Sequence, residues 1–164
     1  MQRRSGFAWA VLMFAGGCGM AESPDDRAAA LWAISKGGGA SLTVNDLVIR
    51  DATRLPAEPF RVDGIDLNNQ KIDEADLAKL ESLEHLRYLH LYDSGITDAG
   101  LEHIARIASL EELELSYNDV TDEGLQQLAP LANMKTLFAR GTGVTPDGAE
   151  GLRAARPKLT IHVR

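Results

Sequence analysis

A fixed spacing of apolar residues constrains the fold of this 164-residue chain more than any other feature. One register recurs at every 24th position as Ile65, Leu89, Leu113, Leu137 and Ile161. Four further apolar registers keep the same step, and their first members are Leu67, Ile72, Leu77 and Leu80. A period of about 20 to 50 residues indicates a solenoid, because each repeat buries its open faces against its neighbours.

Two local patterns divide each repeat. Leu89 and Leu91 alternate across a polar residue, which predicts a short strand with one buried face. Leu101, Ile104 and Ile107 follow at steps of three, which predicts the apolar side of a helix. The repeats are therefore expected to stack with a parallel sheet on the inner side and helices on the outer side.

Polar residues between strand and helix predict how each helix begins. Threonine and aspartate stand at equivalent places as Thr97-Asp98, Thr121-Asp122 and Thr145-Pro146-Asp147. We expect each threonine to cap its helix and each aspartate to favour the positive end of the helix dipole. A second polar position is expected to bond the neighbouring backbone, and it holds Gln70, Ser94, Asn118 and Thr142.

The repeat reads Leu-x-x-Leu-x-Leu, four further residues and then Ile-Thr-Asp-x-Gly-Leu, most cleanly at 86–107 and 110–131. It resembles the leucine-rich repeat, in the subtype found in exported bacterial proteins and similar to ribonuclease-inhibitor-like and F-box-associated repeats. The resemblance covers 60–164, about four copies of 24 residues and a terminal strand. It implies an α/β horseshoe segment that binds macromolecules through its concave sheet without catalysis, and convex helices behind that sheet. The terminal copies depart from the pattern, with Asp76 at the glycine position and Ala149 at a leucine position.

The N-terminus is predicted to be a targeting signal. Arg3 and Arg4 precede an apolar run at 7–15, which is shorter than the roughly 20 residues that span a bilayer. Small residues then lead to Cys18, an arrangement that resembles a bacterial lipobox. We expect residues 1–17 to be a signal peptide, with Cys18 as the lipidated first residue of the mature protein. Cleavage after Ala21 and an uncleaved anchor are the alternatives.

Residues 18–59 are predicted to form a linker and an N-terminal cap made of a helix and a hairpin. The helix is expected to begin at Ser23 and to end at three consecutive glycines. The hairpin is expected over 41–49. Trp32 and Phe60 are then core residues of the cap.

The buried registers determine which strand residues point outward. Tyrosine combines apolar area with a polar tip, so an outward cluster of aromatic residues suits recognition. The predicted partner-binding residues are Tyr88, His90, Tyr92, Glu112, Glu114, Tyr117, Phe138 and Arg140. Asp66, His90 and Glu114 should lie on adjacent strands, where two carboxylates flanking the imidazole would favour its protonated form.

Composition and spacing argue against several functions. The net charge of −7 disfavours binding to nucleic acid, and a single cysteine cannot form an internal disulfide. No nucleophile or phosphate loop accompanies His90, and His162 would lie too far from it to share a metal ion. We therefore expect no catalysis, no cofactor and no metal.

The expected function is that of an exported protein- or peptide-binding module of the bacterial cell envelope, in the periplasm or on the outer surface. Its membrane contact would be the lipid on Cys18. Three alternatives stay open at this point: a glycan or cell-wall binder whose tyrosines stack on sugar rings, a structural spacer, and an intracellular adaptor like the F-box relatives.

Overall fold

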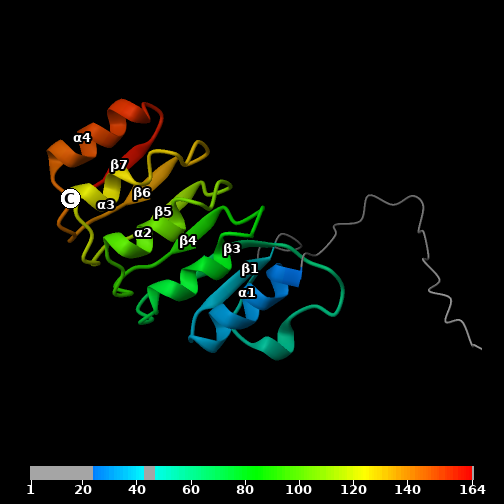
Figure 1. Cartoon of the computed structure of the whole chain (residues 1–164). Coiled ribbons are helices and arrows are strands. Elements are labelled where there is room, and N and C mark those ends of the chain that lie inside the picture. The colour runs from blue at the N-terminus through cyan, green and yellow to red at the C-terminus, as the bar shows by residue number, and fades with distance from the viewer. Residues whose placement is uncertain (1–23, 43–46, 164) are drawn as a thin grey trace, which may run out of the picture.

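The computed structural model describes residues 24–42 and 47–163 of the chain (Figure 1). Within these residues a single sheet has the strand order β2-β1-β3-β4-β5-β6-β7. Its parallel part consists of β3 (Val62–Asp66), β4 (Tyr88–His90), β5 (Glu112–Glu114), β6 (Thr136–Phe138) and β7 (Thr160–His162). The predicted signal peptide 1–17, Cys18, Ala21 and the turn of the predicted hairpin lie outside the described residues.

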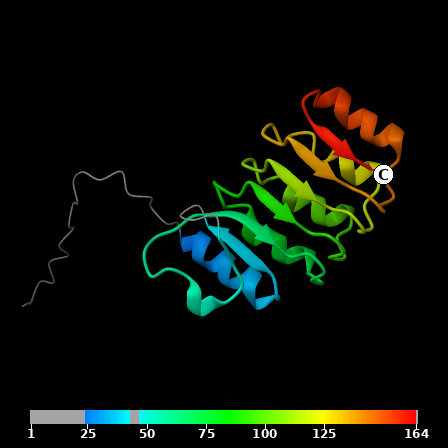
Figure 2. The same cartoon turned by 180° about the vertical axis from the view of Figure 1, so that it is seen from behind.

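Helical segments cover one face of this sheet, and the other face is formed by the strands alone (Figure 1, Figure 2). The helical segments of the repeats are η2 (Glu74–Leu80), α2 (Asp98–Ile104), α3 (Asp122–Gln126) and α4 (Pro146–Ala155). Each follows its strand along the chain, so one repeat is a strand, a turn, a helical segment and a return. The first of them is a 3-10 helix, whereas the pattern predicted only a helix. The predicted α/β architecture with a parallel sheet is confirmed.

The core lies between the sheet and the helices and is made by the periodic residues. Leu89, Leu113 and Leu137 are fully buried on neighbouring strands, and Leu101 and Leu125 are fully buried on the helices that face them. Parallel pairing joins Leu89 to Leu113 and Leu113 to Leu137, so residues 24 positions apart occupy equivalent sites. Burial of one such leucine contributes about 2 kcal/mol, which makes the stack of repeats the main source of stability.

The N-terminal segment contains α1 (Pro24–Ser35), β1 (Gly39–Leu42), β2 (Leu47–Ile49) and the short η1 (Ala52–Arg54). The β1 strand pairs antiparallel with both β2 and β3, so it occupies the edge of the parallel sheet. The α1 helix ends at Ser35, and Gly37 in the turn that follows has a φ of 88°, which suits glycine. Trp32 and Phe60 are buried, as predicted for core residues. Asp26 joins the helix to the sheet by accepting a 2.8 Å hydrogen bond from the backbone of Val62.

The aspartates at the helix starts bond the following repeat, a role that the sequence did not indicate. The Asp98 carboxylate accepts hydrogen bonds from the Thr121 amide at 2.9 Å and from the Thr121 hydroxyl at 2.6 Å. Asp122 holds Thr145 in the same way, at 2.8 and 2.7 Å. In the first repeat Glu74 accepts from the Thr97 amide at 2.6 Å. These carboxylates therefore form a ladder of hydrogen bonds that links one repeat to the next.

This ladder explains the glycine of the Thr-Asp-x-Gly motif. A Cβ atom at Gly124 would overlap the carboxylate of Asp98, and one at Gly148 would overlap that of Asp122. Asp76 occupies the glycine position of the first repeat, which follows the N-terminal segment and not another repeat. Its carboxylate pairs with Lys79 and Lys36, which together lower its pKa to about 2.

The predicted threonine caps are present at two of three positions. Thr97 accepts a bond from the Ala99 amide at 3.3 Å, and Thr145 accepts one from the Gly148 amide at 3.1 Å. Thr121 stands at the N-cap of α3 as predicted, but its side chain makes no cap bond there, and its hydroxyl donates to Asp98.

The polar position after each strand, which holds Gln70, Ser94, Asn118 and Thr142, hydrogen-bonds the backbone in every repeat, as predicted. Asn118 is the most extensively bonded: its amide nitrogen donates to the carbonyl of Leu91 at 2.6 Å, and its oxygen accepts from the amides of Ser94 and Ile96 at 3.0 Å each. The other members bond a nearby carbonyl each, namely Gln70, Ser94 and Thr142.

Candidate functional site

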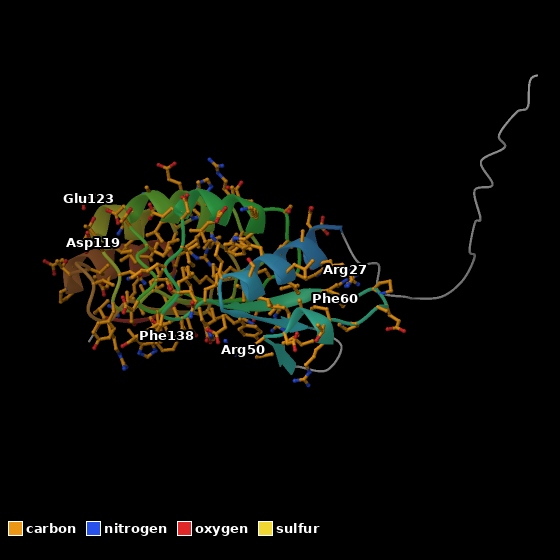
Figure 3. The ribbon with its side chains drawn as sticks, turned by 90° about the horizontal axis from the view of Figure 1, so that it is seen from below. Arg27, Arg50, Phe60, Asp119, Glu123 and Phe138 are labelled. Carbon is orange, nitrogen blue, oxygen red and sulfur yellow. The ribbon has the colours of Figure 1, made fainter. Side chains whose placement is uncertain are left out.

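The sheet surface opposite the helices, called the strand face here, carries the predicted binding residues. Its register is the predicted one, and the first row is Gly64, Tyr88, Glu112, Thr136 and Thr160. The second row is Asp66, His90, Glu114, Phe138 and His162. Phe138 and Arg50 project from this face, on the side away from the helices (Figure 3).

His90 contacts a different carboxylate from the two that the register suggested. Its Nε2 atom lies 3.1 Å from Oε1 of Glu112, which is in the other row. Asp66 pairs with Arg50, which follows β2 in the N-terminal segment. Glu114 accepts a 2.6 Å bond from the backbone amide of Ser116. The predicted placement of the three residues on adjacent strands is confirmed, but Asp66 pairs with Arg50 and Glu114 with the Ser116 amide, and neither hydrogen-bonds His90.

Aromatic side chains make three separate contacts on or beside the strand face. Tyr92 and Tyr117 form a tilted pair with ring centroids 5.0 Å apart. Phe138 stacks on His162, with centroids 4.8 Å apart and ring planes 11° apart. The guanidinium of Arg87 lies 5.1 Å from the centroid of Tyr88. The predicted tyrosines and Phe138 thus share one side of the molecule. The contact of Phe138 with His162 was missed, although their neighbouring places in one row pointed to it.

Two hollows lie along the strand face within the described residues. The first, of about 160 Å³, is mostly apolar and is lined by Val48, Gly64, Ile65, Asp66, Tyr88 and His90. The second, of about 280 Å³, is lined by Asn68, Asn69, His90, Tyr92, Glu112 and Glu114. Five of the eight predicted binding residues line these hollows. Tyr117 adjoins the second hollow through its contact with Tyr92, and Phe138 and Arg140 belong to the next repeat.

A third hollow, of about 350 Å³, lies where the strands begin, and it includes Arg87, Glu111 and Asn133. Arg87 and Lys135 both bond the carboxylate of Glu111, at 3.0 and 2.6 Å. The two cations lower the pKa of Glu111 to about 2, with Arg87 as the larger cause. These three residues are 24 positions apart, so the period carried a signal for this ion-pair row that the sequence reading missed. Because these charged residues come from three successive repeats and pair with one another, the row links the repeats.

The described residues contain no group of three or more histidine, cysteine or acidic side chains arranged to hold a metal ion. Within 24–42 and 47–163, no helix is both long and apolar enough to cross a membrane. The side chains of the strand face are aromatic rings, carboxylates, the separate imidazoles of His90 and His162, and the exposed Arg140.

Comparison with known proteins supports the repeat assignment. A family model of the leucine-rich repeat matches residues 82–105 and 107–129. No curated protein matches the chain significantly. Among solved structures, actin-binding site 2 of leiomodin-1 is similar with a TM-score of 0.51 and 14% identity, over 62% of this chain and 70% of that one.

Two bacterial structures show weaker likeness. A leucine-rich repeat protein of Leptospira interrogans has a TM-score of 0.42 and 21% identity, over 56% of this chain. An internalin of Listeria monocytogenes has a TM-score of 0.42 and 19% identity, over 61% of this chain. The chain spans 22% of the length of the Leptospira protein and 34% of that of the internalin.

The 24-residue period, the match at 82–129 and the stacked strand-and-helix units agree with one another. Proteins of this fold are in general binding modules and not enzymes. The chain contains leucine-rich repeats, matched at 82–105 and 107–129, and has the fold of leucine-rich repeat proteins.

Proposed function

We propose that the chain is a non-enzymatic module that holds a protein or peptide on its strand face. The observation that carries the proposal is the gathering of aromatic side chains there, all partly exposed: Tyr88, Tyr92, Tyr117 and Phe138. Tyrosine and phenylalanine provide large contact areas at little cost in conformational entropy, and interface hot spots are enriched in such residues. Exposed aromatic clusters on monomeric proteins commonly mark a binding site.

The charges beside the rings fit a polypeptide ligand. Glu112 and Glu114 offer carboxylates to a basic patch, and Arg140 offers a guanidinium to a carboxylate of the ligand. The leiomodin-1 segment of the same fold is named as an actin-binding site, which supports a protein as the class of ligand. The full proposed contact set is Tyr88, His90, Tyr92, Glu112, Glu114, Tyr117, Phe138 and Arg140.

The module is proposed to act in the bacterial cell envelope. The support is the sequence of residues 1–17 and the small residues before Cys18, which would place a lipid on that cysteine. Residues 18–59 would then be a linker and cap, and 60–164 the binding repeats. Labelling the cells with a radioactive fatty acid tests the anchor: the wild-type chain should take up label, and Cys18→Ala should not. A labelled Cys18→Ala protein would contradict the proposal.

The binding proposal is tested by affinity capture from envelope extracts with the full chain. The double variant Tyr88→Ala and Tyr92→Ala should lose the captured protein, because it removes two of the rings. The control Glu102→Ala and Glu123→Ala changes exposed residues of α2 and α3 on the helix side and should retain it. Equal capture by the tyrosine variant and the wild type would refute the proposed face.

Salt dependence separates a protein ligand from a neutral glycan. A basic protein held by Glu112 and Glu114 should dissociate more readily as the ionic strength rises, because the attraction is screened. Stacking of tyrosines on a neutral sugar should be nearly insensitive to salt. Retention that is unchanged between 0.05 and 0.5 M salt, roughly a threefold change in screening length, would favour the glycan.

A further inference from the structure

One backbone position of the repeat adopts a left-handed conformation in every copy. Its members have φ values of 60°, 45°, 61° and 65°, and they are Asn69, Asp93, Tyr117 and Gly141. Asparagine, aspartate and glycine are the residues that tolerate this conformation best. A bulky side chain there is strained, because its Cβ atom approaches the carbonyl oxygen. Tyr117 is therefore the exception in a position that the fold otherwise fills with small residues.

Burial does not compensate this strain. Tyr117 is 57% exposed, among the most exposed large apolar residues of the described chain. Its ring rests against Tyr92 on one side. On the other side it lies beside Gly141, where a Cβ atom would come within 3.0 Å of the ring. A strained residue that contributes little to the core points to a role in function.

The ring of Tyr92 joins this strained tyrosine to the second hollow. Tyr92 lines the hollow together with Glu112 and Glu114. Glu112 contacts His90 through its Oε1 atom, and Glu114 accepts from the Ser116 amide through its Oε1 atom. Among the described residues the Oε2 atom of each glutamate makes no hydrogen bond, so both carboxylates keep an acceptor at the wall of the hollow. An aromatic face beside two carboxylates is complementary to a planar cation, which stacks on the ring and bonds the acid. Arginine fits this pair of demands better than lysine, because its guanidinium is planar and forked.

We propose that Tyr92, Tyr117 and the adjoining acidic hollow form an anchor for one arginine side chain of a protein partner. The strained backbone of Tyr117 holds its ring at the rim of that hollow. The anchor rests on the proposed function, since it assigns a partner chemistry to one part of the strand face.

The strain is tested by thermal unfolding of the full chain in a Tyr92→Ala background, where the ring pair no longer contributes. Adding Tyr117→Asn should raise the midpoint by about 2–4 °C, the shift expected when the left-handed strain of one bulky residue is relieved in a chain of this length. Adding Tyr88→Asn is the matched control, because Tyr88 lies in regular β4, and it should lower the midpoint. A midpoint that is unchanged or lower with Tyr117→Asn overturns the strain argument.

The anchor is tested by NMR titration of the full chain with N-acetyl-arginine amide. We expect saturating shifts of Tyr92 and Tyr117 in the millimolar range, as suits a ligand of this size, and at least tenfold weaker binding to Glu112→Gln and to Tyr117→Asn. Thr160→Asn, an exposed position of β7 outside the proposed contact set, should bind as the wild type does. N-acetyl-norleucine amide and N-acetylglucosamine serve as apolar and sugar probes, and neither should produce these shifts.

Equal binding of the norleucine probe, binding of the sugar alone, or no response to the arginine probe would each overturn the anchor. These outcomes are distinct from failure of the proposed function. If the arginine probe fails while the Tyr88 and Tyr92 double variant still loses its captured protein, the strand face binds a protein by other contacts.

Discussion

Replacing Gly148 by alanine tests the ladder of carboxylates between repeats. Gly148 lies in α4, and the Cβ atom of an alanine there would overlap the carboxylate of Asp122 from the preceding repeat. That carboxylate holds the amide and the hydroxyl of Thr145, at 2.8 and 2.7 Å. The substitution must therefore displace Asp122 and break both bonds, although alanine is the better helix former.

The estimated free energies predict that Gly148→Ala is destabilising when the Asp122 carboxylate is present and stabilising when it is absent. Loss of two hydrogen bonds to a carboxylate at a partly exposed site costs about 1–3 kcal/mol. Alanine in place of glycine inside a helix contributes about 0.5–1 kcal/mol. Gly148→Ala should therefore destabilise the wild type by about 0.5–2 kcal/mol. In an Asp122→Ala background the bonds are already absent, so the same substitution should stabilise by about 0.5–1 kcal/mol.

A double-mutant cycle measured by equilibrium urea unfolding gives the coupling energy directly. Gly151→Ala in the same helix is the control, because its Cβ atom would meet the side-chain end of Gln126, at 3.2 Å, and not the Asp122 carboxylate. That variant should change the free energy of unfolding by the same amount in both backgrounds. If Gly148→Ala costs the same free energy with and without the Asp122 carboxylate, the glycine is not there to admit the carboxylate and this account of the motif is wrong.

Three further predictions concern other parts of the molecule. Asn118→Ala should lower the free energy of unfolding by about 2–4 kcal/mol because it leaves buried backbone groups unpaired, whereas Thr142→Ala at the equivalent position should cost about 1 kcal/mol or less by the same urea assay. Phe60→Ala should cost about 3–5 kcal/mol, since the ring is fully buried, and a cost below about 1 kcal/mol would show that the N-terminal segment packs loosely. The pKa of Glu111 is lowered to about 2, so its ion pairs stabilise the fold above about pH 4.5 and this contribution is lost as the pH falls toward 2. Glu111→Gln should therefore lose less stability in acid than the wild type, by up to about 1 kcal/mol for a surface group. An acid unfolding curve of Glu111→Gln that equals that of the wild type would contradict this.

Much of the fold could be predicted because the period forces it. Leu89 and Leu113 can be buried together only if their strands pair in register, and this fixes the sheet and the side on which the helices lie. The helix start at Thr121 was predicted correctly, but the Thr121 hydroxyl bonds Asp98 and makes no cap bond within α3. Capping within one helix and bonding to the previous repeat use the same residue types, so spacing along the chain could not separate them.

The candidate site was predictable in position but not in contacts. The period placed Asp66, His90 and Glu114 in one row, which the pairing of the strands confirms. It could not place Arg50, because that residue lies in the non-repeating segment and reaches Asp66 across the single strand β1. The period of a repeat sequence predicts which repeat residues are neighbours. It does not predict that a residue outside the repeats, such as Arg50, pairs with one of them.

The division between constrained and unconstrained positions bears on the strand face. Burial determines the leucine registers, the carboxylate ladder determines the Thr-Asp-x-Gly turn, and backbone bonding determines Asn118 and its equivalents. The outward strand positions carry none of these demands, and they differ from one repeat to the next: Tyr88, Glu112 and Thr136 share one row. Stability of the solenoid would be served as well by any β-forming polar residue there. The aromatic side chains on this face are thus not required by the fold, which supports the proposed contact with a ligand.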